Sequence, residues 1–262
     1  MGHYDEPVRR WMHSPVRTIS EGAKLTEADH ILREHTLSSL AVVDKSGIAV
    51  GVISRTDLLR AGRAKSAFGR RAPLLELPDQ TVDSVMTKGL LSVPSDTPLS
   101  DAAQLMVSRH VHRVYVIDGG TLAGVLSTRD LMDAVATHKE KAPLSDFMSS
   151  PVLTVNALDT VAHATDRLND AHVAGVLVLD ESEWPVGLFT QVEALQAREL
   201  PGSTPVEDVM NYALLCLDMD TPLHRAARHA VETRARRIVA VRERRVWGMI
   251  TGIDFARIAS RK

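Results

Sequence analysis

Four copies of one pattern run through the chain, and this repeat constrains the fold more than any other feature. Each copy opens with a methionine, and a glycine follows 38 or 39 positions later. The four pairs are Met12 and Gly51, Met86 and Gly124, Met148 and Gly187, and Met210 and Gly248. A sequence period of this kind indicates repeated structural units. The chain is therefore predicted to hold four similar domains, at residues 8–61, 81–136, 143–198 and 205–260.

Each copy predicts a strand, a helix, two strands and a second helix. The first helix shows apolar or small residues at helical spacing, as in Leu99, Ala102 and Met106, and its alanines allow another element to approach closely. Continuous apolar runs such as 114–117 are typical of strands that are buried on both faces. The final helix is expected to begin at an acidic residue, for example Asp57. A unit of roughly 55 residues buries little surface alone, so pairing of units is expected.

One motif closes all four copies: glycine, two apolar residues, a hydroxyl residue, two variable residues and an acid. The hydroxyl–acid pairs are Ser54 and Asp57, Ser127 and Asp130, Thr190 and Glu193, and Thr251 and Asp254. A carboxylate can accept hydrogen bonds from both ribose hydroxyls, and the start of a helix suits a phosphate, so the motif is compatible with nucleotide binding. The same spacing also forms a helix capping box, which needs no ligand. Both interpretations stay open at this point.

The four segments resemble CBS (cystathionine-β-synthase) domains over residues 8–260. The resemblance rests on the closing motif, on an apolar strand that ends in aspartate in three copies, and on the opening dipeptides Trp11-Met12, Val85-Met86, Phe147-Met148 and Val209-Met210. It implies an α/β fold of α+β repeat units, with four CBS domains paired into two Bateman modules and ligand clefts between paired sheets. It also implies a regulatory protein rather than an enzyme. The implied ligand is AMP, ADP, ATP or S-adenosylmethionine, with no catalytic cofactor.

The resemblance further assigns roles within the clefts. In the family, the acid of the closing motif holds the ribose, and basic residues just before the apolar strand of the paired unit meet the phosphate. The corresponding positions in units one to four are Ser38-Ser39, His112-Arg113, Ala174-Gly175 and Arg236-Arg237. Only the second and fourth units are basic at this position, so the four clefts are not expected to be equivalent.

The cleft of Asp57 is expected to be the best equipped for a phosphorylated ligand. Asp57 would face His112 and Arg113, and arginine makes strong bidentate contacts with phosphate. The other residues expected to line this cleft are Thr18, Ile19, Ser54 and Arg129.

The other three clefts are each incomplete. The expected pairings are Asp130 with Ser38 and Ser39, Glu193 with Arg236 and Arg237, and Asp254 with Ala174 and Gly175. The first and third lack a basic residue, and the second has a carboxylate one methylene longer than aspartate. We therefore expect the first pair of units to bind nucleotide better than the second pair.

Composition limits the other classes of function. The formal net charge of −2 provides no general attraction to nucleic acid or to an anionic membrane. No apolar stretch approaches the roughly 18 residues of a membrane span, and the N-terminus lacks the blocks of a signal peptide. The single cysteine, Cys216, fits a reducing compartment and is expected in the core or a cleft wall rather than in catalysis. These features predict a cytoplasmic protein.

Two alternatives to ligand sensing remain. The first is a ligand-free interaction scaffold in which the closing motif acts only as a cap. The second, which is less favoured, is nucleic-acid binding through the arginine-rich segment 225–245, although Trp247 is the only aromatic residue nearby for base stacking. The close histidine pairs lack the spacing of a zinc site, so no metal is expected. A protein partner of unknown identity is also expected, and two arrangements stay open: the four units close a disk of two modules within one chain, or two chains pair through helix faces as a homodimer.

Overall fold

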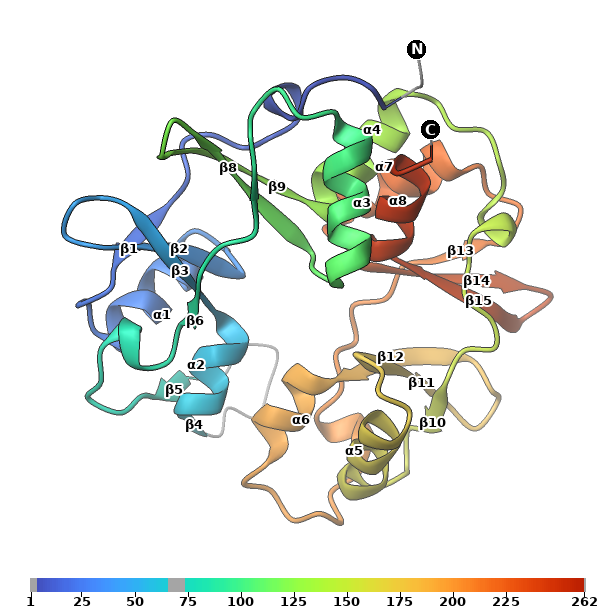
Figure 1. Ribbon diagram of the computed structural model, residues 1–262. Helices are drawn as coiled ribbons and strands as arrows, with labels where there is room; N and C mark the ends of the chain where they lie inside the picture. Colours follow the sequence, from blue (N-terminus) through green and yellow to red (C-terminus); the bar gives the residue numbers. More distant parts are fainter. Residues whose placement is uncertain (1–3, 66–73, 262) are drawn as a thin grey trace.

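Four β/α units surround a common centre in the computed structural model, which describes residues 4–65 and 74–261 (Figure 1). In each unit the first two strands are parallel and are joined by a helix, and the third strand is antiparallel to the second. A second helix follows the third strand. The predicted order of elements is confirmed in all four units.

The elements have the following bounds. Unit one contains β1 (Thr18–Ser20), α1 (Leu25–Glu34), β2 (Ser39–Val43), β3 (Ala49–Ser54) and α2 (Arg55–Ala61). Unit two contains β7 (Ser92–Val93), α3 (Leu99–Arg109), β8 (Arg113–Asp118), β9 (Thr121–Ser127) and α4 (Thr128–Thr137). Unit three contains β10 (Thr154–Asn156), α5 (Val161–Asp170), β11 (Gly175–Leu179), β12 (Pro185–Thr190) and α6 (Gln191–Ala197). Unit four contains β13 (Cys216–Asp218), α7 (Leu223–Thr233), β14 (Arg237–Arg242), β15 (Arg245–Thr251) and α8 (Gly252–Ala259).

The second helix of each unit begins two residues before the acid, not at the acid as the sequence predicts. In unit one the hydroxyl residue Ser54 is the N-cap and Asp57 is the third residue of α2. The capping box explains the difference, because it places the hydroxyl outside the helix and the acid within its first turn.

The opening segments of the units are exchanged within each pair. A short 3-10 helix at Val8–Arg10, from the start of copy one, packs into the core of unit two, and that at Val82–Ser84, from the start of copy two, packs on unit one. Met12 covers Gly124 and Met86 covers Gly51. The helices at Leu144–Asp146 and Val206–Asp208 make the same exchange between units three and four.

This exchange explains the repeated glycine. A Cβ atom at Gly51 would lie 2.8 Å from Met86 Sδ and 2.7 Å from the Thr87 carbonyl oxygen, so only glycine allows the partner's opening segment to lie there. The exchanged segment also adds β6 (Thr87–Lys88) to the edge of the first sheet. The paired units are therefore interlocked by backbone pairing as well as by side-chain contacts.

Units one and two pair through their sheets, and so do units three and four. In unit three Val176 and Val178 point into the unit's own core, while Leu177 between them packs against Val239 of unit four. Tyr115 of unit two has the position that corresponds to Leu177, and it is also buried. Strands buried on both faces are thus confirmed, and the chain forms two Bateman modules.

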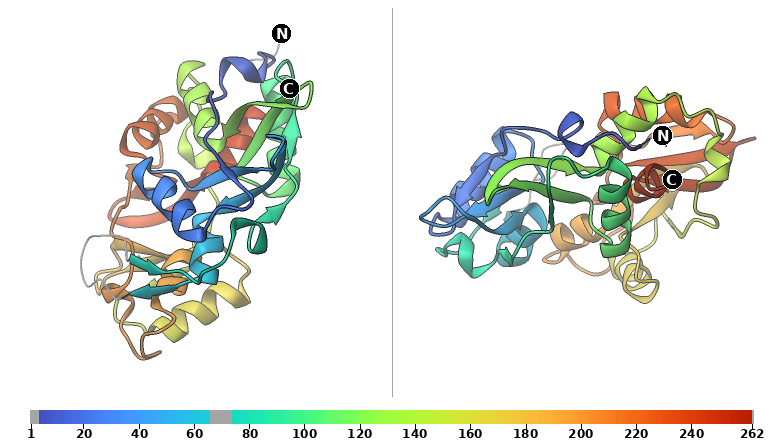
Figure 2. Two further views of the ribbon diagram at one scale, coloured as in Figure 1. Left: turned by 90° about the vertical axis from the view of Figure 1, so that its left-hand side faces the viewer. Right: turned by 45° about the horizontal axis from the view of Figure 1, so that its top comes forward.

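Helices join the two modules. Helices α3, α4, α7 and α8 pack together, so that units two and four share one continuous core, and the alanines Ala102 and Ala227 are fully buried within it. Helices α2 and α6 pack between units one and three, but each of these units keeps a separate core. Both views of Figure 2 show the green and red units packed together through helices, with the blue unit beside the green sheet.

A short pair of strands lies between the first two units. The segment 62–80, between the first two predicted domains, contains a short antiparallel pair, β4 (Arg63–Lys65) and β5 (Leu74–Glu76), and its residues 66–73 lie outside the described part of the chain. Among the helices of the described ranges, none has the length and hydropathy needed to cross a membrane.

Candidate functional site

All four closing motifs form complete capping boxes. In unit one, the Asp57 carboxylate accepts hydrogen bonds from the Ser54 backbone N–H at 2.8 Å and from its hydroxyl at 2.6 Å, both through Oδ2. The other three motifs have the same arrangement, with the pairs Ser127 and Asp130, Thr190 and Glu193, and Thr251 and Asp254. The capping role of the motif is confirmed. Each cap uses one carboxylate oxygen, so the second oxygen decides whether the acid can also hold a ligand.

The second oxygen is engaged differently in the four units. His13 contacts Asp130 Oδ1 through Nε2 at 2.8 Å, and Arg257 contacts Asp254 Oδ1 at 2.6 Å. Within the described residues, no hydrogen bond or ion pair reaches Oδ1 of Asp57. Asp57 is also half-buried, whereas Asp130, Glu193 and Asp254 are buried. Asp57 therefore has the most accessible free acceptor of the four acids.

Burial shapes the electrostatics of Asp130. Its loss of solvent raises the pKa of the carboxyl group, while the hydrogen bonds from Ser127 and the contact with His13 act in the opposite direction. The contact with His13 comes from the exchanged opening segment, because His13 pairs with Val125 of unit two. The corresponding residue beside unit one is Thr87, which pairs with Val52.

Positive charge gathers where units one, two and four meet. Burial lowers the pKa of Arg236, and four nearby guanidinium groups lower it further; these belong to Arg113, Arg237, Arg55 and Arg129. Burial also lowers the pKa of His112, followed by the charges of Arg236, Arg237 and Arg113. Burial lowers the pKa of Arg237, and the charge of Glu193 partly offsets this effect. Like charges that repel one another at a partly buried site are complementary to an anion.

Two of these arginines are held in place by hydrogen bonds between units. The Arg113 guanidinium donates to Ser38 Oγ at 2.7 Å and to Ser39 Oγ. Ser38 and Ser39 of unit one occupy the positions that His112 and Arg113 occupy in unit two. Equivalent positions of units one and two therefore contact each other. The Arg237 guanidinium donates to the Ala174 carbonyl oxygen at 3.4 Å, and it also packs on Gly175 across the second pair.

A cavity of about 460 Å³ lies beside this cluster and is enclosed by units one, three and four. Four of the residues that the sequence assigns to ligand contacts line it: Thr190, Glu193, Arg236 and Arg237. The structure thus brings Glu193 and the two arginines together. Asp57, His112 and Arg113 are outside its lining, although Arg55 and Thr56, which flank Asp57 in the chain, belong to it.

Other assigned residues lie outside the lining of this cavity and differ in exposure. Thr18 is exposed at the start of β1, while Ile19 is buried in the core of unit one. Thr251 and Asp254 cap α8, and the Arg129 guanidinium donates to the Val231 carbonyl oxygen at the end of α7.

Some lining residues were missed by the sequence analysis. Arg55 is the main example: its guanidinium is held by the carbonyl oxygens of Leu37 at 2.8 Å and Leu32 at 2.9 Å. Arg55 occupies a variable position of the closing motif, and an arginine at this position could have indicated a residue that lines the cavity. Arg33, Asn211 and Arg234 also line the cavity, and no spacing rule in the sequence points to them.

Cys216 packs against the sheet cluster shared by units three and four. Burial raises the pKa of its thiol, which disfavours the reactive thiolate form. Among the described residues, no group of three or more His, Cys, Asp or Glu side chains is placed to hold a metal ion.

Four similar β/α units that pair through their sheets define a class of repeat proteins, and the sequence identifies the family. The sequence profile described as "CBS domain" matches residues 8–64, 82–137, 144–199 and 206–261. The chain belongs to the CBS domain family.

Among relatives, the uncharacterized protein MJ1404 of Methanocaldococcus jannaschii is 27% identical over 271 aligned positions. The match covers 95% of this chain and 61% of MJ1404, so the chain spans less than two thirds of that relative's length.

Two solved structures are similar over nearly their full length. One is protein MJ1225 of Methanocaldococcus jannaschii, proposed to be an archaeal homolog of γ-AMPK, with a TM-score of 0.75, 14% identity and coverage of 96% of this chain and 99% of that one. The other is an uncharacterized conserved protein of Pyrococcus horikoshii, with a TM-score of 0.68, 19% identity and coverage of 97% and 99%. At these identities the similarity shows the fold alone.

Proposed function

We propose that this protein is a regulatory protein that binds an adenine nucleotide or adenosyl ligand between its units. The candidates are AMP, ADP, ATP and S-adenosylmethionine. The observation that carries the proposal is the cluster of guanidinium groups around Arg236, which lies next to a cavity of about 460 Å³ and to capped carboxylates.

The charge of the cluster favours phosphorylated ligands. The guanidinium groups of Arg113, Arg55 and Arg129 each repel that of Arg236, and a phosphate oxygen brought beside Arg236 relieves part of that repulsion. Hydrogen bonds between arginine and phosphate are charge-assisted and are stronger than those between neutral groups. S-adenosylmethionine carries a positive sulfonium, which the same cluster disfavours. The nucleotides are therefore the stronger candidates.

The carboxylates supply the complementary part of the site. A ribose presents two hydroxyl donors, and Asp57 Oδ1 is an acceptor without a partner among the described residues. Glu193 lies in the lining of the cavity with Arg236 and Arg237, so ribose and phosphate contacts can come from the same cavity. We propose both the Asp57 cleft and the Glu193 cavity as nucleotide positions. The Asp130 and Asp254 clefts are proposed as weaker positions, because His13 and Arg257 occupy their second oxygens.

Calorimetric titration with AMP, ADP, ATP and S-adenosylmethionine tests the proposal. The informative variant is Asp57→Asn, because the asparagine oxygen still accepts the Ser54 hydrogen bonds and keeps the cap. We expect nucleotide affinity to fall by roughly tenfold, the effect of losing about 1.4 kcal/mol of binding free energy. Arg113→Ala is expected to act in the same direction. Asp133→Ala, on the exposed face of α4, is the matched control.

The alternative function is that of an interaction scaffold without a ligand. It is supported by the capping boxes, which are complete in all four units without any bound molecule. Thermal unfolding separates the two functions, since a ligand that binds only the folded state raises Tm with its concentration. A Tm that stays constant with every adenosyl compound would favour the scaffold.

We also propose that the protein has no catalytic activity of its own and acts in the cytoplasm on a protein partner. The half-buried thiol of Cys216 and the use of the hydroxyl–acid pairs as helix caps support a binding role. The test is whether the wild-type protein retains a protein partner and whether the amount retained changes when nucleotide is added. Such a change would support this regulatory role.

A further inference from the structure

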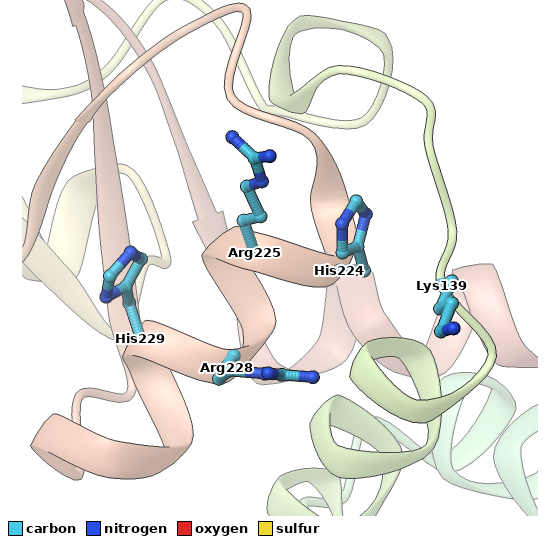
Figure 3. A pocket seen from close by; sticks show the side chains of 5 residues that line it. All are labelled: Lys139, His224, Arg225, Arg228 and His229. Atoms are coloured by element: carbon cyan, nitrogen blue, oxygen red, sulfur yellow. The ribbon is translucent and has the colours of Figure 1, made fainter.

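A second concentration of positive charge lies on the surface at the junction of α4 and α7. We call it the basic groove and define it by five side chains: Lys139, His224, Arg225, Arg228 and His229. They line a hollow of about 250 Å³. Figure 3 shows that four of them come from one helix, α7, and that Lys139 reaches the groove from the end of α4.

The basic groove has no carboxylate partner among residues 4–65 and 74–261. In the described part of the chain, no carboxylate lies within ion-pair distance of Lys139, Arg225 or Arg228. Elsewhere on the surface exposed arginines do pair, as Arg10 does with Glu6 and Arg242 with Asp218. The groove therefore presents free hydrogen-bond donors and no acceptor of opposite charge.

The positive charge of Arg225 near the start of α7 does not stabilise this helix. Arg225 is the third residue of α7, where the helix dipole favours a negative charge. The third residues of α1 and α3 are Glu27 and Asp101, in agreement with that preference. The arginine therefore needs an explanation other than helix stability, and an anion bound at this end of the helix supplies one.

Local hydrogen bonding fixes part of the groove. The Glu140 carbonyl oxygen accepts a hydrogen bond from the His224 backbone N–H at 2.9 Å and also lies 2.8 Å from His224 Nδ1. Because a carbonyl oxygen only accepts, Nδ1 carries the proton and the ring is held in one orientation. Lys139 follows α4 with a left-handed backbone, φ +56°, and directly precedes Glu140, whose carbonyl oxygen contacts His224. The groove is a built feature of the junction rather than a random group of surface side chains.

We propose that the basic groove binds a phosphoryl group. Two guanidinium groups and an ammonium match the charge and the acceptor oxygens of a phosphate, and arginine contacts it in a bidentate manner. Apart from the two histidine rings, no aromatic side chain lines the groove, so it has little surface on which a nucleobase could stack. The group can come from a small phosphorylated compound or from a phosphorylated side chain of a protein partner.

This site is separate from the proposed nucleotide cavity. The groove is lined by residues 224–229 of α7, while Thr233, the last residue of the same helix, lines the cavity, and the two linings share no residue. An α-helix rises about 1.5 Å per residue, so the groove residues lie roughly 6–14 Å from Thr233 along the helix axis. The proposal for the groove therefore does not depend on nucleotide binding at the centre.

NMR of ring-labelled histidine tests the proposal directly, with inorganic pyrophosphate as the probe. We expect titration to shift the ring signals of His224 and His229. The double variant Arg225→Asp, Arg228→Gln gives α7 the residues that α3 has at the same positions, Asp101 and Gln104, so the helix should still form. In this variant we expect affinity to fall by at least roughly tenfold. Arg245→Asp, at the exposed start of β15, is the matched control and should retain binding.

The outcomes separate the sources of the phosphate and the competing explanations. Tighter binding of a phosphoserine peptide than of pyrophosphate supports a protein partner, and the reverse supports a small compound. Histidine signals that do not move, or binding lost only when Arg236 is replaced, would overturn the proposal. Tighter binding of an oligonucleotide than of either probe, lost in the double variant, would overturn it in favour of nucleic acid.

Discussion

The two helical contacts between the modules differ in how far their cores are joined. Between units two and four, four helices form a single core that includes Phe255 and Met106, both fully buried. Between units one and three, α2 and α6 touch, but each unit keeps its own core. One hydrogen bond that crosses this second contact runs from the Arg198 guanidinium to the Leu59 carbonyl oxygen at 2.8 Å. One side of the molecule is thus a continuous core and the other a contact between separate cores.

The difference matters because the central cavity lies toward the second side. Its lining includes Leu59 of α2 and Gln196 of α6, together with the arginines of unit four. A ligand in the cavity would add contacts between units whose cores are separate. Such a ligand can change the packing of units one and three to the extent that it binds one arrangement more tightly than another.

The largest effect is expected from Phe255→Ala in the shared core. Removing a fully buried phenyl group costs about 3–5 kcal/mol of unfolding free energy. Phe189→Ala in the core of unit three is the matched change, since Phe189 is also fully buried. Hydrogen exchange should show that Phe255→Ala exposes amides in units two and four together, whereas Phe189→Ala acts mainly on unit three. The same pattern of exchange in both variants would contradict the division into one shared and two separate cores.

The next effect is expected from Arg236→Gln at the centre. Nucleotide binding should lose about 1.5–3 kcal/mol, the usual contribution of a hydrogen bond to a charged group. The unliganded protein should unfold no more easily than wild type, because the substitution removes repulsion with Arg113, Arg237, Arg55 and Arg129. Calorimetry and denaturant titration measure the two quantities, with Arg245→Gln as the control. A lower free energy of unfolding with an unchanged affinity for nucleotide would show that Arg236 has a structural role.

A smaller effect is expected from His13→Thr. The substitution removes the contact with Asp130 Oδ1 and places at this position the residue type that Thr87 provides beside Asp57. We expect an additional, weak nucleotide position to appear in calorimetry, since Asp130 then gains a free acceptor. A binding stoichiometry that stays constant would mean that His13 does not limit this cleft.

The smallest effect is expected from Arg198→Ala. A hydrogen bond contributes about 0.5–1.5 kcal/mol net, and this one is a single part-buried bond. Global unfolding should therefore change little, while amides of α2 and α6 should exchange faster. Unchanged exchange would indicate that side-chain packing alone holds units one and three together.

Much of this architecture could be predicted from the sequence. The repeat, the buried strands and the capping motif follow from residue patterns within one copy. The exchange of opening segments could not be predicted, because the spacing of Met12 and Gly51 is the same whether the methionine covers its own glycine or that of the partner. The central cavity was also inaccessible, since Arg55, Glu193 and Arg236 meet through packing of three units rather than through any spacing along the chain.

Hydrogen exchange with and without ATP tests the central claim most directly. If nucleotide occupies the centre and joins the separate cores, amides of α2 and α6 should become protected as ATP is added, and those of α4 and α8 should change little. This protection should be lost in Arg236→Gln. Protection confined to α4 and α8, or no protection at saturating ATP, would contradict the account.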